Sequence, residues 1–228
     1  IGFEYVRAVE KEMRARGRLM MANATPHAWF WLAPLLDVMG TETDWNHGGA
    51  WRPMADDELL YRRALCGGKP YCFLMNSDFS KFPHEATEKF MQRALAYGMF
   101  PGFFSADAST GHYFTRPELY NRDRPLFKRY LPLCKRVAEA GWQPLTGAAS
   151  DNEAVIVERF GAQPGPCFLT VYNLAESRQR ATVTLRTIRA DGASRELLSG
   201  DRVAWPGGCA AFDLGPGEVR VVSLGGQP

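Results

Sequence analysis

The segment LLDVMGTETDW, residues 35–45, joins an apolar stretch to a group of acidic residues. Residues 35–39 are apolar apart from Asp37, which is typical of a strand in a parallel sheet that is covered on both faces. The carboxylates of Glu42 and Asp44 follow directly. In parallel βα folds the active site lies at the carboxyl ends of the strands. The segment therefore predicts a buried strand that ends in candidate catalytic residues.

Apolar strands alternate with helical sequence throughout the first 150 residues. The expected strands are RLMMANA (18–24), LLDVM (35–39), PYCFLMN (70–76) and MFPGFFSAD (99–107), and the expected helices are 4–17, 25–33, 56–68, 83–98 and 117–141. We expect the last helix to be kinked or divided at Pro125 and Pro132, since proline removes a helical hydrogen bond. Four such units are typical of a parallel sheet.

The sequence changes to an all-β pattern near residue 150. Alternating or β-branched strands are expected at 153–160, 167–174, 181–188, 209–214 and 218–224, with glycine- and proline-rich turns between them. A complete (β/α)8 barrel needs about 250 residues. We therefore predict an α/β protein with two domains. Residues 1–150 form the C-terminal half of a TIM-type barrel, about four βα units, and residues 151–228 form a small antiparallel β-sandwich.

Composition excludes several classes of partner. The formal net charge of the 228 residues is +2, which does not favour nucleic acid or an anionic membrane. No apolar run approaches the roughly 18 residues that a membrane span requires. The five cysteines are scattered, without a C-x-x-C pair, and we expect free, mostly buried thiols. We expect no cofactor and no metal, because no H-x-x-x-H, H-E-x-x-H or phosphate-binding glycine loop is present.

Polar and aromatic residues collect where the predicted strands end. Glu42 is the first candidate for the catalytic acid/base, because it lies at a strand end and has the longer side chain, and Asp44 is the second. Sugar hydroxyls need many hydrogen-bond partners, and the apolar face of a sugar ring stacks on indole. The candidate substrate-binding residues are Asn23, Trp45, Trp51, Arg52, Asn76, Asp78 and Asp107.

Simpler interpretations remain open for these residues. Glu42 and Asp44 are equally consistent with solvated loop acids, and Asp78 with a residue that stabilises a turn. Trp29 and Trp31 lie on a short apolar helix, where we expect core residues. If the candidate acids do form a site, then Glu42 or Asp44 should face a common pocket with Asp78.

The order of elements resembles the C-terminal part of an α-galactosidase-like (β/α)8-barrel glycoside hydrolase. The stretches that carry the resemblance are LLDVMGTETDW, KPYCFLMNSDF, FPGFFSAD and the helix RPLFKRYLPLCKRVAEAGWQP that leads into ERFG. The resemblance implies an aspartate nucleophile after the fourth barrel strand and an acid/base after the sixth. Glu42 or Asp44 falls at the acid/base position, and the nucleophile is expected upstream of Ile1.

The sequence therefore predicts a carbohydrate-active protein, part of a glycoside hydrolase that uses carboxylate acid/base catalysis. Its expected partners are a carbohydrate substrate and either the missing N-terminal half of the barrel or a second subunit that completes it. The alternatives are a non-catalytic carbohydrate-binding protein and a metal-dependent barrel enzyme of other chemistry. The β-sandwich contains no cluster of acidic residues, so we expect it to pack on the last barrel helix and to contribute stability rather than chemistry.

Overall fold

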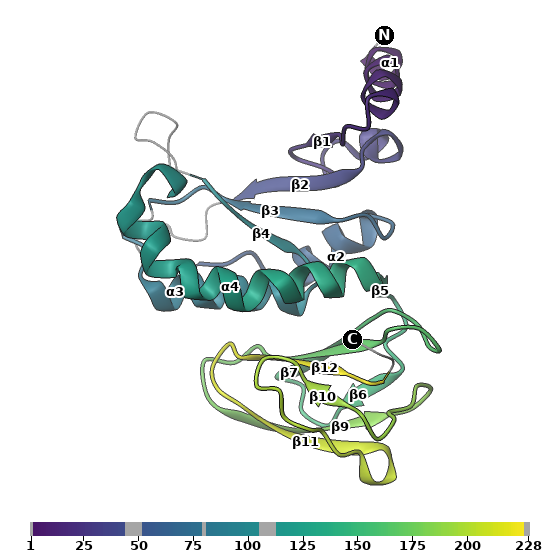
Figure 1. The fold of residues 1–228 in the computed structure, drawn as a ribbon, viewed down its shortest axis with the longest axis vertical. Coiled ribbons are helices and arrows are strands. Elements are labelled where there is room, and N and C mark those ends of the chain that lie inside the picture. The colour runs from purple at the N-terminus through teal and green to yellow at the C-terminus, as the bar shows by residue number, and fades with distance from the viewer. Residues whose placement is uncertain (1, 44–51, 79–80, 105–112, 226–228) are drawn as a thin grey trace. The chain divides into compact units, whose positions relative to one another are not determined.

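A computed structural model describes residues 2–43, 52–78, 81–104 and 113–225 (Figure 1). The chain divides into two compact units. The first unit contains residues Ile1–Thr87 and Met99–Arg124, and the second contains Glu88–Gly98 and Pro125–Pro228.

The first unit is built on a four-stranded parallel sheet. Its strands are β1 (Met21–Ala22), β2 (Val38–Thr43), β3 (Tyr71–Met75) and β4 (Phe100–Phe103), and they pair in the order β1-β2-β3-β4. All four predicted strands of this part are present, although β1 is shorter than expected. Because sequential parallel strands lie side by side, the residues that follow them reach the same edge of the sheet.

The two faces of this sheet differ in burial. Residues on one face, such as Met39, Tyr71, Phe73 and Met75, are at most 2% exposed. The opposite face is less well covered, and it carries Met21, which is 43% exposed, together with the partly buried residues Val38, Cys72, Leu74 and Phe100 and the exposed residue Glu42. This second face is the one that points into the centre of a closed barrel. Apolar side chains and a carboxylate thus share an incompletely covered surface.

Helices precede or follow the strands as the periodicity predicts. They are α1 (Gly2–Ala15), α2 (Asp56–Leu65), α3 (His84–Ala96) and α4 (Pro117–Ala140), with short 3-10 helices η1 (Phe30–Leu35) and η3 (Tyr113–Thr115). Three acidic residues in the first turn of α2 favour its N-terminus through the helix dipole. None of the described helices combines the length and apolarity that a membrane crossing demands.

Three details differ from the sequence-based predictions. The helix expected over 25–33 is replaced by turns and the later helix η1, because the side chain of Thr25 bonds to the carbonyl of Ala22 and to the amide of Gly40. Trp29 and Trp31 are 50% and 44% exposed, so neither is a core residue. Helix α4 is not divided, since both prolines lie inside one helical element.

The second unit contains two antiparallel sheets. One has the order β10-β12-β8-β7-β5 and the other β11-β9-β6. The strands are β5 (Trp142–Gln143), β6 (Ala148–Ser150), β7 (Val155–Phe160), β8 (Phe168–Asn173), β9 (Gln179–Leu185), β10 (Arg195–Glu196), β11 (Cys209–Leu214) and β12 (Val219–Ser223). A short 3-10 helix, η4 (Pro206–Gly208), precedes β11. The five predicted strands are present.

Two short strands lie before the predicted domain boundary at residue 150 but pair with strands that lie after it. Strand β5 pairs with β7, and β6 pairs with β9. The division into residues 1–150 and 151–228 stays a prediction, because these pairings connect residues on either side of position 150.

Strand β8 is buried on both faces. Leu169 and Val171 belong to the core of the sandwich, together with Val183, Leu214 and other apolar residues. The alternate side chains of β8, Phe168 and Thr170, face helical residues of the same unit. Thr170 Oγ1 donates to the carbonyl of Ala96 over 2.7 Å, and the guanidinium of Arg136 on α4 lies 5.0 Å from the ring centre of Phe168. The sandwich therefore packs on residues of α3 and α4, as expected for the last barrel helix.

Candidate functional site

Glu42 lies next to the end of β2, between residues that follow the two flanking strands. Asn23, directly after β1, donates from Nδ2 to Glu42 Oε1 over 2.7 Å. Asn76, directly after β3, donates from Nδ2 to Glu42 Oε2 over 3.3 Å. Each carboxylate oxygen therefore has its own amide donor, and the two donors come from opposite sides of the strand.

The strand order explains this convergence. Strand β2 pairs with β1 on one side and with β3 on the other, and Glu42 stands opposite Leu74 in the register. The backbone amide of Asn76 continues the ladder by donating to the carbonyl of Thr43 over 2.9 Å. The position of the Asn76 backbone is thus fixed by the sheet itself.

The carboxylate keeps free hydrogen-bonding capacity. An ionised carboxylate offers about four lone-pair positions, and the two amides occupy one on each oxygen. Glu42 is exposed, so its remaining positions face solvent on the incompletely covered side of the sheet. The Oδ1 atom of Asn76 is buried and has no hydrogen-bond partner among the residues that the structure describes. The arrangement can hold a carboxylate in a fixed plane while it exchanges a proton with a ligand.

Helix α2 supports β2 from the opposite face of the sheet. Arg62 donates from Nη1 to Thr41 Oγ1 over 2.8 Å and from Nε to Glu58 Oε1 over 2.8 Å. Burial, followed by the positive charge of Arg62, lowers the pKa of His27 below its ordinary value. Within the described ranges, His27 Nδ1 is buried and has no hydrogen-bond partner. The bridging Arg62 supports the back of the strand that carries Glu42.

The other predicted site residues are distributed differently. Asp78 lies 3.4 Å from Lys81 Nζ, and its carbonyl accepts from the Lys81 amide, so it takes part in a turn. Arg52 is exposed. Asp44, Trp45, Trp51 and Asp107 lie outside the described residues. Of the predicted set, Glu42, Asn23 and Asn76 come together.

A second polar cluster connects the segments that follow β3 and β4. Asp123 on α4 is fully buried and accepts from His84 Nδ1 over 2.8 Å and from the hydroxyl of Tyr113 over 2.9 Å. Arg122 donates to both of its oxygens, over 2.8 and 2.7 Å. His84 begins α3 and Tyr113 lies in η3, so one carboxylate fixes both segments.

The electrostatics of this cluster favour the ionised carboxylate. Burial alone would raise the pKa of Asp123, but the hydrogen bonds from Arg122, His84 and Tyr113 outweigh it and hold the pKa below its ordinary value. Burial, followed by the charge of Asp123, raises the pKa of Tyr113, which therefore stays a hydrogen-bond donor. The sequence offered no signal for this cluster, because His84 and Asp123 are 39 residues apart.

Within the described ranges, no three His, Cys, Asp or Glu side chains are grouped so that they could hold a metal ion.

No protein-family model and no curated protein sequence matches the chain. Solved structures match it over nearly its whole length. A GH27 β-L-arabinopyranosidase from Geobacillus stearothermophilus is 16% identical, with a TM-score of 0.55, and the match covers 98% of this chain and 54% of the other. A putative alpha-galactosidase from Bacteroides fragilis is 10% identical, with a TM-score of 0.66 and coverages of 99% and 51%.

A noncanonic maltogenic alpha-amylase from Thermotoga neapolitana is also similar, at 12% identity and a TM-score of 0.60, with 100% of this chain and 59% of the other covered. At such identities the likeness shows the fold alone. The chain spans about half the length of the structures that it matches. It has the fold of the C-terminal half of a glycoside hydrolase barrel with its following β-sheet domain, which confirms the predicted fold class and the resemblance.

Proposed function

We propose that this chain contributes part of the active site of a carbohydrate-cleaving enzyme and that Glu42 is its general acid/base. The observation that supports the proposal most is the hydrogen bonding of Glu42 by Asn23 and Asn76 at the carboxyl edge of the sheet. Enzymes with parallel βα sheets use this edge for chemistry. The similarity to an arabinopyranosidase, an alpha-galactosidase and an alpha-amylase favours a sugar as substrate.

The proposed reaction is hydrolysis of a glycosidic bond. Protonated Glu42 donates its proton to the oxygen of the leaving group as the bond to the anomeric carbon breaks. The resulting carboxylate then takes a proton from the water that attacks the anomeric carbon, which regenerates the acid. Asn23 and Asn76 hold the plane of the carboxylate through both steps, so the proton is delivered along one direction.

A second carboxylate is required on the other side of the sugar ring, as nucleophile or as the group that stabilises the oxocarbenium ion. We propose that it belongs to further barrel strands, either of the same polypeptide or of a second subunit. The incompletely covered face that bears Met21, Leu74 and Phe100 supports this, since such strands would bury it. Asp44, Trp45, Trp51 and Asp107 stay candidate site residues.

The decisive experiment compares leaving groups in the complete protein or assembly that contains this chain. An aryl glycoside with a strongly acidic phenol needs little proton donation, whereas a disaccharide needs much. Glu42→Gln should therefore lower kcat for the disaccharide by about 10²–10⁴-fold and for the activated glycoside far less. Glu153→Gln, at an exposed acid of the β-sandwich, is the matched control and should leave both rates unchanged.

Equal losses for both substrates would contradict a role of Glu42 in proton donation. Sugar binding without hydrolysis in the wild type would favour the non-catalytic carbohydrate-binding alternative instead. The two results are distinguishable, because the first needs measurable turnover and the second needs its absence.

A further inference from the structure

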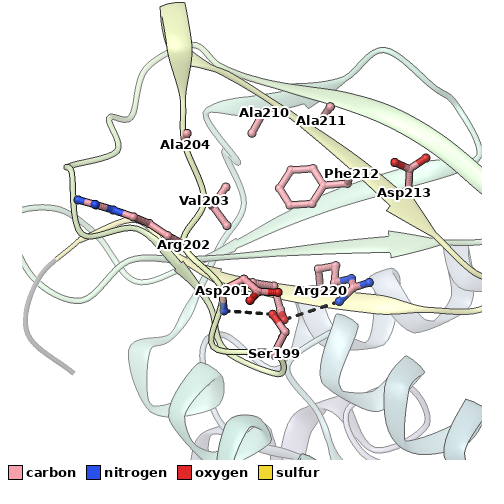
Figure 2. A pocket seen from close by; sticks show the side chains of 11 residues that line it. Ser199, Asp201, Arg202, Val203, Ala204, Ala210, Ala211, Phe212, Asp213 and Arg220 are labelled. Atoms are coloured by element: carbon pink, nitrogen blue, oxygen red, sulfur yellow. Dashed lines mark hydrogen bonds and ion pairs between the residues drawn. The ribbon is translucent and has the colours of Figure 1, made fainter.

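A polar cavity lies in the β-sandwich of the second unit, between an edge strand of each sheet. Its volume is about 300 Å³. Strand β11 pairs with β9 alone in the described chain, and the turn after β10 closes the other side. The lining residues are Glu196, Ser199, Asp201, Arg202, Val203, Ala204, Ala210, Ala211, Phe212, Asp213 and Arg220 (Figure 2).

Two lining carboxylates are without partners. Asp201 and Asp213 are exposed, and within the described part of the chain their side chains make no hydrogen bond or ion pair. Ser199 Oγ accepts from the amide of Asp201 over 3.2 Å, which leaves its hydroxyl proton available. Figure 2 shows Asp201 and Ser199 on one side of the Phe212 ring and Asp213 on another. The cavity thus offers two anionic acceptors and a hydroxyl donor, beside the guanidinium groups of Arg202 and Arg220.

The wall behind these groups is held by hydrogen bonds and ion pairs. Glu196 is 4% exposed and accepts from the amides of Leu198, Ser199 and Val221, so its own capacity is used within the protein. Arg220 lies 3.8 Å from Glu196 and 2.7 Å from Glu218. A wall held in this way is formed before a ligand arrives, which lowers the entropic cost of binding.

The floor is made of small and flat groups. Ala204 and Ala211 are exposed, and Phe212 is buried with its ring centre 6.2 Å from that of Trp205. Alanine side chains leave room beside the strand, and the unpaired side of β11 presents backbone donors and acceptors there. The volume lies at the lower end of the range for small-molecule sites, about 300–1,000 Å³.

We propose that this cavity binds a saccharide unit, as a second carbohydrate site that does not involve Glu42. A sugar hydroxyl both donates and accepts hydrogen bonds. It can therefore donate to the carboxylates of Asp201 and Asp213 and accept from Ser199 or Arg220. A small cation would be repelled by the positive charge of Arg220, which lines the same cavity. A polyhydroxylated ligand suits carboxylates, a hydroxyl and a guanidinium together, and this mixture is what the cavity provides.

The test is titration of the 228-residue chain with D-galactose, L-arabinose and maltotriose, followed by isothermal calorimetry and by amide chemical shifts. At least one saccharide should bind saturably and shift the amides of Ser199, Ala211 and Asp213. The double variant Asp201→Asn, Asp213→Asn should weaken this binding at least tenfold, because hydrogen bonds to charged groups are the stronger ones. Ala211→Trp, which fills the cavity, should abolish it.

Controls separate this site from the one at Glu42. Glu153→Gln and Glu42→Gln should leave the shifts at Ser199 and Asp213 unchanged. The proposal is overturned if none of the three saccharides binds saturably, if the amide shifts cluster around Glu42 alone, or if the double variant binds as the wild type does. Saturable binding of the peptide Lys-Ala-Lys in place of the saccharides would also overturn it and would identify a peptide site on the β11 edge.

Discussion

Asn23 Nδ2 and Glu42 Oε1 lie 2.7 Å apart although 19 residues separate them in the sequence. The contact exists because β1 and β2 are parallel neighbours, so that the residue after one strand meets the residue near the end of the other. Asn76 makes the equivalent contact from β3. Parallel pairing thus converts three separate strand ends into one hydrogen-bonded group.

Asn23→Asp should change the pH dependence of any reaction that Glu42 carries. Two carboxylates at this distance repel each other when both are ionised, so the pair titrates with one pKa value raised. The limb of the pH–rate profile that depends on Glu42 should therefore move to higher pH by about one unit or more. The measurement is kcat against pH for the complete protein. Asn121→Asp, at an exposed position of α4, adds the same charge elsewhere and should leave the limb in place.

The sequence was sufficient for the fold because each long strand carries its own signal. In β3, for example, five residues from Tyr71 to Met75 are apolar and lie between turn residues, which predicts a buried strand without knowledge of its neighbours. The short strands β5, β6 and β10 have two or three residues each and exist only because distant partners pair with them. No local pattern indicates such strands.

The sequence predicted where the site residues lie along the strands, but it did not predict which of them contact one another. The strand-end rule identified Glu42, Asn23 and Asn76, whereas their hydrogen bonds depend on strand order, which periodicity does not specify. Asp123 shows the opposite case, since nothing local distinguishes a buried aspartate on an amphipathic helix from a solvated one. Trp31 was expected in the core because indole is apolar, but its burial depends on what covers η1.

Asp123→Asn should destabilise the first unit by about 2–4 kcal/mol, since a buried carboxylate loses its charge while Arg122 keeps its own. The measurement is urea denaturation at neutral pH. Asp213→Asn is the control, because its exposed side chain has no partner in the described part of the chain, and it should stay within about 0.5 kcal/mol of the wild type.

The stability provided by Asp123 should also depend on pH in one direction. Its pKa is lowered in the folded state, so its contribution is complete above the unfolded value of about 3.9 and is lost as the pH falls through the lower folded value. The difference between the wild type and Asp123→Asn should therefore shrink as the pH falls below about 4. A difference that grows on acidification would contradict the ionised state of this carboxylate.

Gly161→Ala should destabilise the second unit more than Gly200→Ala. Both glycines have φ near +80°, so both substitutions carry the same backbone cost of about 1–2 kcal/mol. At Gly161 the added Cβ would collide with the carbonyl oxygen of Pro166, whereas at Gly200 no atom of the described residues lies within 4 Å of it. An additional loss of about 1–3 kcal/mol is expected for Gly161→Ala in thermal or urea unfolding. Equal losses would show that the turn before Pro166 can move.

Thiol labelling should report whether the second face of the parallel sheet is covered. Cys72 lies on this face and is partly buried, and burial raises the pKa of its thiol, so it should react slowly with a maleimide at pH 8. Adding the strands that complete a barrel should protect Cys72, because those strands would pack against Leu74 and its neighbours. Cys209 of the β-sandwich is the internal control and should be labelled at the same rate in both preparations. If the 228-residue chain is a monodisperse monomer in which Cys72 does not react, this face is already covered. The proposal that further strands pack on it would then be contradicted.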